Sequence, residues 1–140
     1  MNTRILIAAT AGAILYFLLG WLIYDVLVAD YYATHSVTQY YNGLIKSNPS
    51  FIGIFFSCFA FTLVLAVIFG NMANITTIKD GALAGTTISL LVALYLNLNI
   101  WSMFNMIGKT VVIADSLISA IVGGILGAVI AGILGYKRDA

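Results

Sequence analysis

The sequence predicts an all-α polytopic membrane protein: an antiparallel bundle of four transmembrane helices, with one longer outer loop between helices 1 and 2. The first observation behind this prediction is composition, because 62% of the 140 residues are hydrophobic and only 8% are charged. In soluble domains about a quarter of all residues are charged. A water-exposed surface cannot be built from this inventory, so the outer surface must face lipid. The net charge of +1 also argues against nucleic acid as a partner.

The second observation is that four apolar runs are long enough to cross a bilayer, which takes about 20 helical residues. The spans are expected at about residues 5–25, 51–70, 81–101 and 112–136. Backbone groups in lipid must be satisfied within their own segment, so such long unpatterned runs predict helices. The whole chain, residues 1–140, is therefore expected to form a single transmembrane domain.

The first run, Ile5 to Tyr24, is uncharged and lies between Arg4 and Asp25. It is longer than the apolar core of a signal peptide, and no small-residue cleavage site follows it, so we expect a retained span. The outer loop then runs to Ser50 and is rich in tyrosine. Its tyrosines are expected to form either an ordinary interfacial belt or a cap over an outward-facing pocket: Tyr31, Tyr32, Tyr40 and Tyr41.

Small residues recur at every fourth position of the third and fourth runs. In lipid there is little hydrophobic drive between helices, so close approach depends on small side chains. We therefore expect the third and fourth spans to pack closely, within one chain or across a dimer. The predicted packing residues are Gly81, Gly85, Ser89, Gly123, Gly127 and Gly132.

The distribution of Lys and Arg predicts the orientation. Four of these residues fall on the side that carries both termini, and two fall on the opposite side: Arg4, Lys79, Lys137 and Arg138 against Lys46 and Lys109. Because cytoplasmic loops are enriched in Lys and Arg, the termini are expected in the cytoplasm, with the protein in a bacterial inner membrane.

Polar residues within the apolar regions point to a candidate ligand site. The order of four spans places Asp25, Asn97 and Asp115 in the same outer layer of the membrane. Ionisable groups inside a membrane are costly and merit a functional hypothesis. Two interpretations of Asp115 stay open: a cap on a helix that starts at Ser116, or a side chain directed into the bundle near Asn97. His35, in the outer loop, is a candidate pH-sensitive partner of Asp25.

The sequence gives little support to other kinds of chemistry. The single Cys58 and the single His35 leave no metal-ligand spacing, so neither a metal nor another cofactor is expected. No catalytic constellation or phosphate-binding loop stands out. An intramembrane enzyme is therefore the least favoured function.

Two short segments resemble a bacterial domain-of-unknown-function family of small four-span membrane proteins. In that family the first span ends in a Gly-x-x-Trp-Tyr-like motif, matched here by residues 20–24, where Ile23 replaces the usual Trp. The third span of the family opens with Gly-Ala and a following Gly, matched here by residues 80–85. The resemblance implies the four-span architecture and brings no established activity.

Three functions remain in competition at this point. The first is a non-enzymatic binding or permeation module with an outward-facing polar pocket. The second is a structural or accessory subunit of a larger membrane complex, and the third is the intramembrane enzyme. Besides the lipid bilayer, we expect a second copy of the chain or another membrane subunit as partner. A cavity lined by the Asp and Asn residues would favour the first function. A dry core, with the rows of small residues turned outward, would favour the second.

Overall fold

A computed structural model of the protein describes residues 2–35, 46 and 48–136. All regular elements in this part of the chain are helical. They are α1 (Thr3–Gly20), the π-helical segment η1 (Trp21–Leu27), α2 (Ala29–His35), α3 (Phe51–Val67), the π-helical segment η3 (Ile68–Met72), α4 (Ile78–Met103) and α5 (Lys109–Gly135). The sequence predictions for Tyr40, Tyr41, Lys137 and Arg138 fall outside the described residues.

Four helical stretches are long and apolar enough to cross a membrane. They span Thr3–Leu27, Phe51–Met72, Ile78–Met103 and Lys109–Gly135. An all-helical protein with four such helices is therefore confirmed. The last helix begins at Lys109, earlier than the predicted residue 112, because the turn after α4 is short.

The third long helix also begins earlier than predicted, and its cap explains why. The Thr77 hydroxyl oxygen accepts a hydrogen bond from the Asp80 backbone N–H at 3.1 Å and donates one to Asp80 Oδ2 at 2.7 Å. This reciprocal pairing satisfies a free N–H group of the first helical turn. As a result α4 starts at Ile78 rather than at Gly81.

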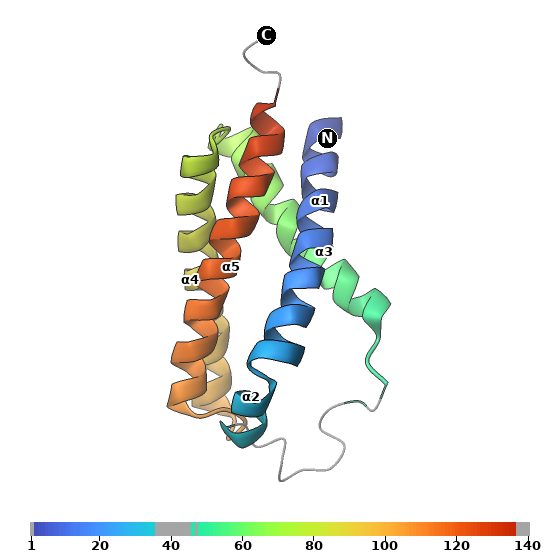
Figure 1. Cartoon of the computed structure of the whole chain (residues 1–140). Coiled ribbons are helices and arrows are strands. Elements are labelled where there is room, and N and C mark those ends of the chain that lie inside the picture. Colours follow the sequence, from blue (N-terminus) through green and yellow to red (C-terminus); the bar gives the residue numbers. More distant parts are fainter. Residues whose placement is uncertain (1, 36–45, 47, 137–140) are drawn as a thin grey trace.

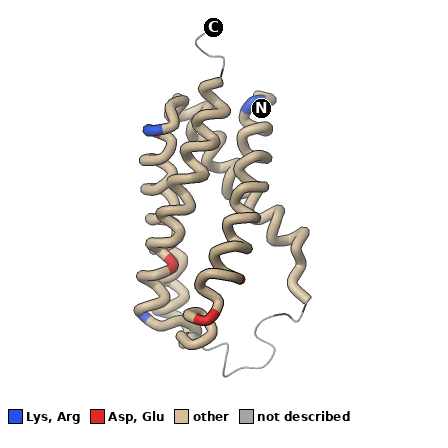
Figure 2. Tube along the Cα trace, viewed as in Figure 1, with Lys and Arg blue, Asp and Glu red and all other residues tan. Residues whose placement is uncertain are grey.

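The start of α1 and the end of α5 lie at one end of the molecule, which we call the terminal end (Figure 1). The opposite end, called the loop end, carries α2 and the connection between α4 and α5 (Figure 1). Basic residues occur at both ends, whereas a long middle section of the trace carries no charged residue (Figure 2). This distribution is the one that a membrane-spanning protein requires.

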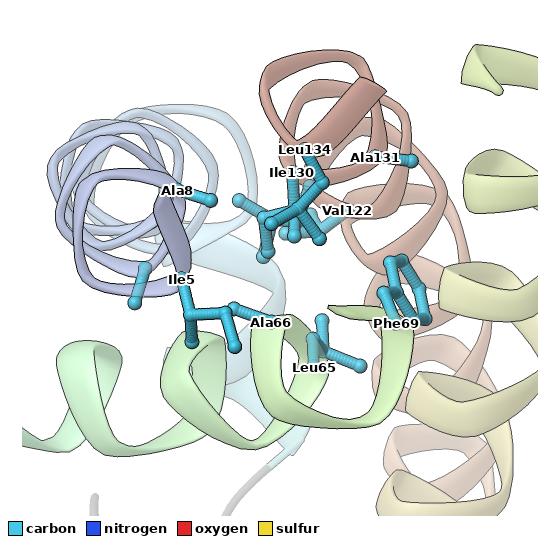
Figure 3. Close-up of a cluster of buried hydrophobic side chains, with 11 residues drawn as sticks. Ile5, Ala8, Leu65, Ala66, Phe69, Val122, Ile130, Ala131 and Leu134 are labelled. Carbon is cyan, nitrogen blue, oxygen red and sulfur yellow. The ribbon is translucent and has the colours of Figure 1, made fainter. Parts of the chain in front are cut away.

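The apolar core lies in the terminal half of the molecule, where α1, α3 and α5 meet (Figure 3). Ile5 and Ala9 of α1 contribute to it, together with Leu65 of α3 and Ile130 of α5, and all four are almost completely buried. Thr62 ties α3 to α1, because its Oγ1 lies 2.9 Å from the Ala9 carbonyl oxygen. This half of the bundle is therefore tightly packed.

The most extensive contact between two elements joins α4 to α5. A Cβ added to Gly85 would lie 2.9 Å from the Gly127 Cα and closer still to the Gly123 carbonyl oxygen. Gly81 likewise faces the Gly127 backbone, and the Gly123 Cα sits against the Ser89 side chain. The two rows of small residues therefore pack against each other, backbone to backbone, within one chain.

Gly132 differs from the other predicted packing residues. A Cβ added to it would lie 3.5 Å from the Ile78 Cγ1, which is an ordinary van der Waals distance. Its lack of a side chain is thus not needed for the close approach of α4 and α5.

Candidate functional site

The candidate site centres on the carboxylate of Asp115, which accepts hydrogen bonds from three side chains. The Tyr24 hydroxyl donates to Oδ1 at 2.7 Å, and the Tyr32 hydroxyl donates to the same oxygen at 2.9 Å. The Asn97 amide donates to Oδ2 at 2.6 Å. Four separate elements, η1, α2, α4 and α5, are thus connected through one carboxylate. We call this set of four residues the Asp115 cluster.

The start of α5 determines where Asp115 points. The helix begins at Lys109 after Gly108, which makes no side-chain cap. Asp115 therefore lies in the second helical turn, where the backbone N–H groups already have partners within the helix. The interpretation of Asp115 as the cap of a helix starting at Ser116 is wrong, and its carboxylate binds side chains instead.

Asn97 reaches Asp115 because it continues the row of small residues on α4. Gly81, Gly85, Ser89 and Asn97 are the buried residues of this helix and follow one another at intervals of four or eight positions. Asn97 is only 9% exposed, and its amide also lies 3.5 Å from the Ser116 hydroxyl oxygen. The close packing of α4 on α5 therefore brings the amide to the carboxylate.

The two tyrosines come from the loop end of the first span and from the short helix that follows it. Tyr24 lies in the π-helical segment η1, and Tyr32 lies in α2. Their rings meet edge to face with centroids 5.6 Å apart. π-Helical turns are often found at functional sites. The sequence assigns Tyr32 to an interfacial belt or to a cap over the pocket. It does not indicate the contacts of Tyr24 and Tyr32 with Asp115, because a pairing across more than 80 positions leaves no local signal.

Tyr32 is the member of the cluster that lies outside the spans. Burial, followed by the proximity of the Asp115 carboxylate, raises the pKa of the Tyr32 hydroxyl above its ordinary value of 10.0. The hydroxyl therefore keeps its proton at neutral pH and serves as a donor to Asp115.

A pocket of about 920 Å³ lies beside the Asp115 cluster, in the loop half of the molecule. It is lined by α1 and η1, by the first half of α3, by the second half of α4 and by the first half of α5. α3 packs mainly on α1 and makes no extensive contact with α4, which leaves this space between them. Several lining residues, such as Phe51 and Leu96, are exposed, so the pocket opens at the surface of the molecule.

The walls of the pocket are apolar, and its polar groups are few. The polar or ionisable lining side chains are Tyr16, Tyr24, Asp25, Ser57, Cys58, Ser89, Asn97, Asp115 and Ser119. Ser89 is 5% exposed, and its hydroxyl oxygen has no hydrogen-bond partner among the described residues. A buried hydroxyl without a partner is unusual in a folded protein, and here the oxygen is covered by Gly123 of α5.

The structure brings together only some of the predicted site residues. Asn97 and Asp115 are in direct contact, and Asp25 lines the same pocket but is exposed and forms no hydrogen bond with any described residue. His35 stacks on Tyr31, with ring centroids 4.3 Å apart, and its Nδ1 lies 2.9 Å from the Tyr31 carbonyl oxygen. Neither a hydrogen bond nor an ion pair joins His35 to Asp25, so the pairing expected for these two side chains is not formed.

Comparison of the chain with models of protein families, with curated proteins and with solved structures found no match. The function is therefore inferred from the geometry of the pocket and of the Asp115 cluster.

Proposed function

We propose that the protein is a non-enzymatic binding module of the membrane that holds an amphipathic molecule in the pocket beside Asp115. The observation that carries this proposal is the combination of a large apolar pocket with one hydrogen-bonded carboxylate at its side. Binding sites for small molecules have volumes of about 300–1,000 Å³, mostly apolar walls and a few convergent polar groups. The pocket fits this description.

Binding is favoured over permeation because the terminal half of the bundle is closed. The core around Leu65, Phe69 and Ile130 is fully buried, and these residues lie between the pocket and the terminal end. A molecule that enters the pocket would find no further path along the bundle.

Binding is also favoured over a purely structural role, because the rows of small residues on α4 and α5 face each other rather than a partner. Assembly with a second copy or another membrane subunit stays a separate prediction.

The setting that we propose for this pocket is an antiparallel transmembrane bundle in a bacterial inner membrane, with a longer outer loop between α1 and α3. The termini would lie in the cytoplasm, and the pocket would then open in the outer leaflet. The excess of Lys and Arg on the side of the termini, four residues against two in the sequence, supports this orientation, as does the resemblance to the four-span bacterial family.

Cysteine labelling tests this orientation. We expect a membrane-impermeant maleimide applied to intact cells to label Asn48→Cys at the loop end and to spare Asn74→Cys at the terminal end. Both variants would be made in a Cys58→Ser background, and both positions are exposed. Permeabilised cells provide the control, because both variants should then react. Labelling of Asn74→Cys alone in intact cells would reverse the orientation.

Fluorescence quenching tests the binding function. Trp21 lines the pocket and Trp101 does not, so in a Trp101→Phe protein Trp21 reports on the pocket. We expect an alkyl alcohol with a brominated chain, added to nanodiscs at increasing mole fraction, to quench Trp21 with a saturable component. Brominated alcohol that only diffuses in the bilayer, without binding in the pocket, should quench Trp21 without saturation.

Two double variants provide the matched comparison. Ala93→Phe with Ser119→Phe places two rings in the pocket and should remove the saturable component. Leu91→Phe with Leu117→Phe places the same rings on the exposed faces of the same two helices and should leave it unchanged. Equal quenching in both double variants, or no saturable component in the parent protein, would contradict the binding function.

A further inference from the structure

We propose that the pocket selects amphiphiles with a cationic head, an ammonium or quaternary amine carried on a hydrocarbon tail. This inference rests on the proposed binding function and adds the chemical class of the ligand. It follows from the charges and the aromatic residues that line the pocket.

The pocket lining carries acidic side chains, and no basic side chain among its described residues balances them. Asp25 and Asp115 both line it, and no Lys, Arg or His is found among the described residues of its lining. The three donors to Asp115 are neutral groups, two phenols and an amide. A carboxylate has about four acceptor positions, so Oδ2 can accept one more donor. A cation at this oxygen would compensate a charge that the protein itself leaves unpaired.

One basic side chain at this end of the bundle is engaged elsewhere. The Lys109 ammonium lies 5.6 Å from the ring centre of Trp101, in a cation–π contact outside the pocket lining. Lys109 therefore does not supply a cation to the two carboxylates. A cationic ligand would not have to displace it.

Aromatic side chains contribute to the wall of the pocket. The aromatic lining residues are Tyr16, Phe17, Trp21, Tyr24, Phe51 and Phe61. The faces of such rings attract cations, most strongly when the cation has been removed from water, as for quaternary ammonium groups. These rings would repel an anionic head, and the two carboxylates would do the same. Charge and aromatic lining thus favour the same ligand class.

Ser89 marks how far the pocket extends along α4. It is the first residue of α4, in chain order, that lines the pocket, and its hydroxyl oxygen is buried against Gly123 rather than open to the pocket. Ser89 precedes Asn97 by two helical turns, which corresponds to about 12 Å along α4. The hydrocarbon tail of a ligand with its head at Asp115 would thus run along the apolar side chains Val92 and Leu96.

Competition against the brominated alcohol tests the preference for a cation. Three unbrominated competitors share a dodecyl chain and differ in the head: trimethylammonium, hydroxyl and carboxylate. At equal mole fraction in a zwitterionic bilayer, we expect the ammonium to relieve Trp21 quenching at about one tenth of the concentration that the alcohol requires, the ratio that one charge-assisted contact produces. The carboxylate should be the weakest competitor.

Variants identify the groups responsible for this preference. Asp115→Asn should remove most of the difference between the ammonium and the alcohol. Asp25→Asn should reduce the difference without altering the fold, because Asp25 is exposed and forms no hydrogen bond with any described residue. Asp30→Asn makes the same charge change on exposed α2, outside the pocket lining, and should leave the difference unchanged.

The possible outcomes separate this inference from the binding function. Equal displacement by all three competitors, or the strongest displacement by the carboxylate, would overturn the cation preference and leave the binding function intact. A preference that persists unchanged in both Asp25→Asn and Asp115→Asn would overturn the assignment to these carboxylates. The absence of saturable quenching by the alcohol itself would overturn the binding function.

Discussion

Replacing Gly127 by alanine is expected to force α4 away from α5 and to lower the free energy of unfolding by about 1–3 kcal/mol. The added Cβ would collide with the Gly81 carbonyl oxygen and would lie 2.9 Å from the Gly85 Cα. Backbone atoms cannot rotate away as a side chain can, so the collision is relieved only by moving a whole helix. A leucine at the same position should have a larger effect.

Gly132 provides the control within the same helix. A Cβ at Gly132 meets the Ile78 side chain at an ordinary distance of 3.5 Å. Alanine is a better helix former than glycine by about 1 kcal/mol, so Gly132→Ala should be neutral or slightly stabilising. Unfolding in mixed micelles at increasing denaturing detergent would measure both variants. Equal stability of Gly127→Ala and Gly132→Ala would mean that the bare faces of α4 and α5 do not meet.

Replacing Asp115 by alanine is expected to have the second large effect, a loss of about 3 kcal/mol or more in the free energy of unfolding. Hydrogen bonds to charged groups contribute about 1.5–3 kcal/mol each, and removing a shared acceptor leaves its donors without a partner. Here the donors are the hydroxyls of Tyr24 and Tyr32 and the amide of Asn97. Asp115→Asn should cost less, because the new amide oxygen can still accept from the tyrosines.

The same unfolding measurement distinguishes this role from simple helix capping. A cap tolerates asparagine almost without loss and costs about 1 kcal/mol when replaced by alanine. Asp25→Ala is the matched control, since this exposed carboxylate has no hydrogen bond with any described residue and should change stability by about 0.5 kcal/mol at most. A loss for Asp115→Ala no greater than that for Asp25→Ala would contradict the Asp115 cluster as a structural element.

Part of the site could be predicted from the sequence because it depends on helical periodicity. Asn97 continues the row that begins at Gly81 and Gly85, and Asp115 continues the row that contains Gly123 and Gly127. When two helices pack through such rows, the residues that continue each row along its helix also lie at the interface. The contact between Asn97 and Asp115 follows from the spacing of small residues in two segments.

The sequence by itself determined the number of helices that are long and apolar enough to cross a membrane, because composition and run length decide whether a segment can be buried in lipid. It did not determine which residues surround Asp115. The start of α5 at Lys109 excluded the cap, η1 and α2 brought Tyr24 and Tyr32 to the carboxylate, and the separation of α3 from α4 opened the pocket. The contacts of the two tyrosines and the opening of the pocket arise from packing between segments far apart in the chain. Local periodicity carries no information about such packing, so only the tertiary structure could decide it.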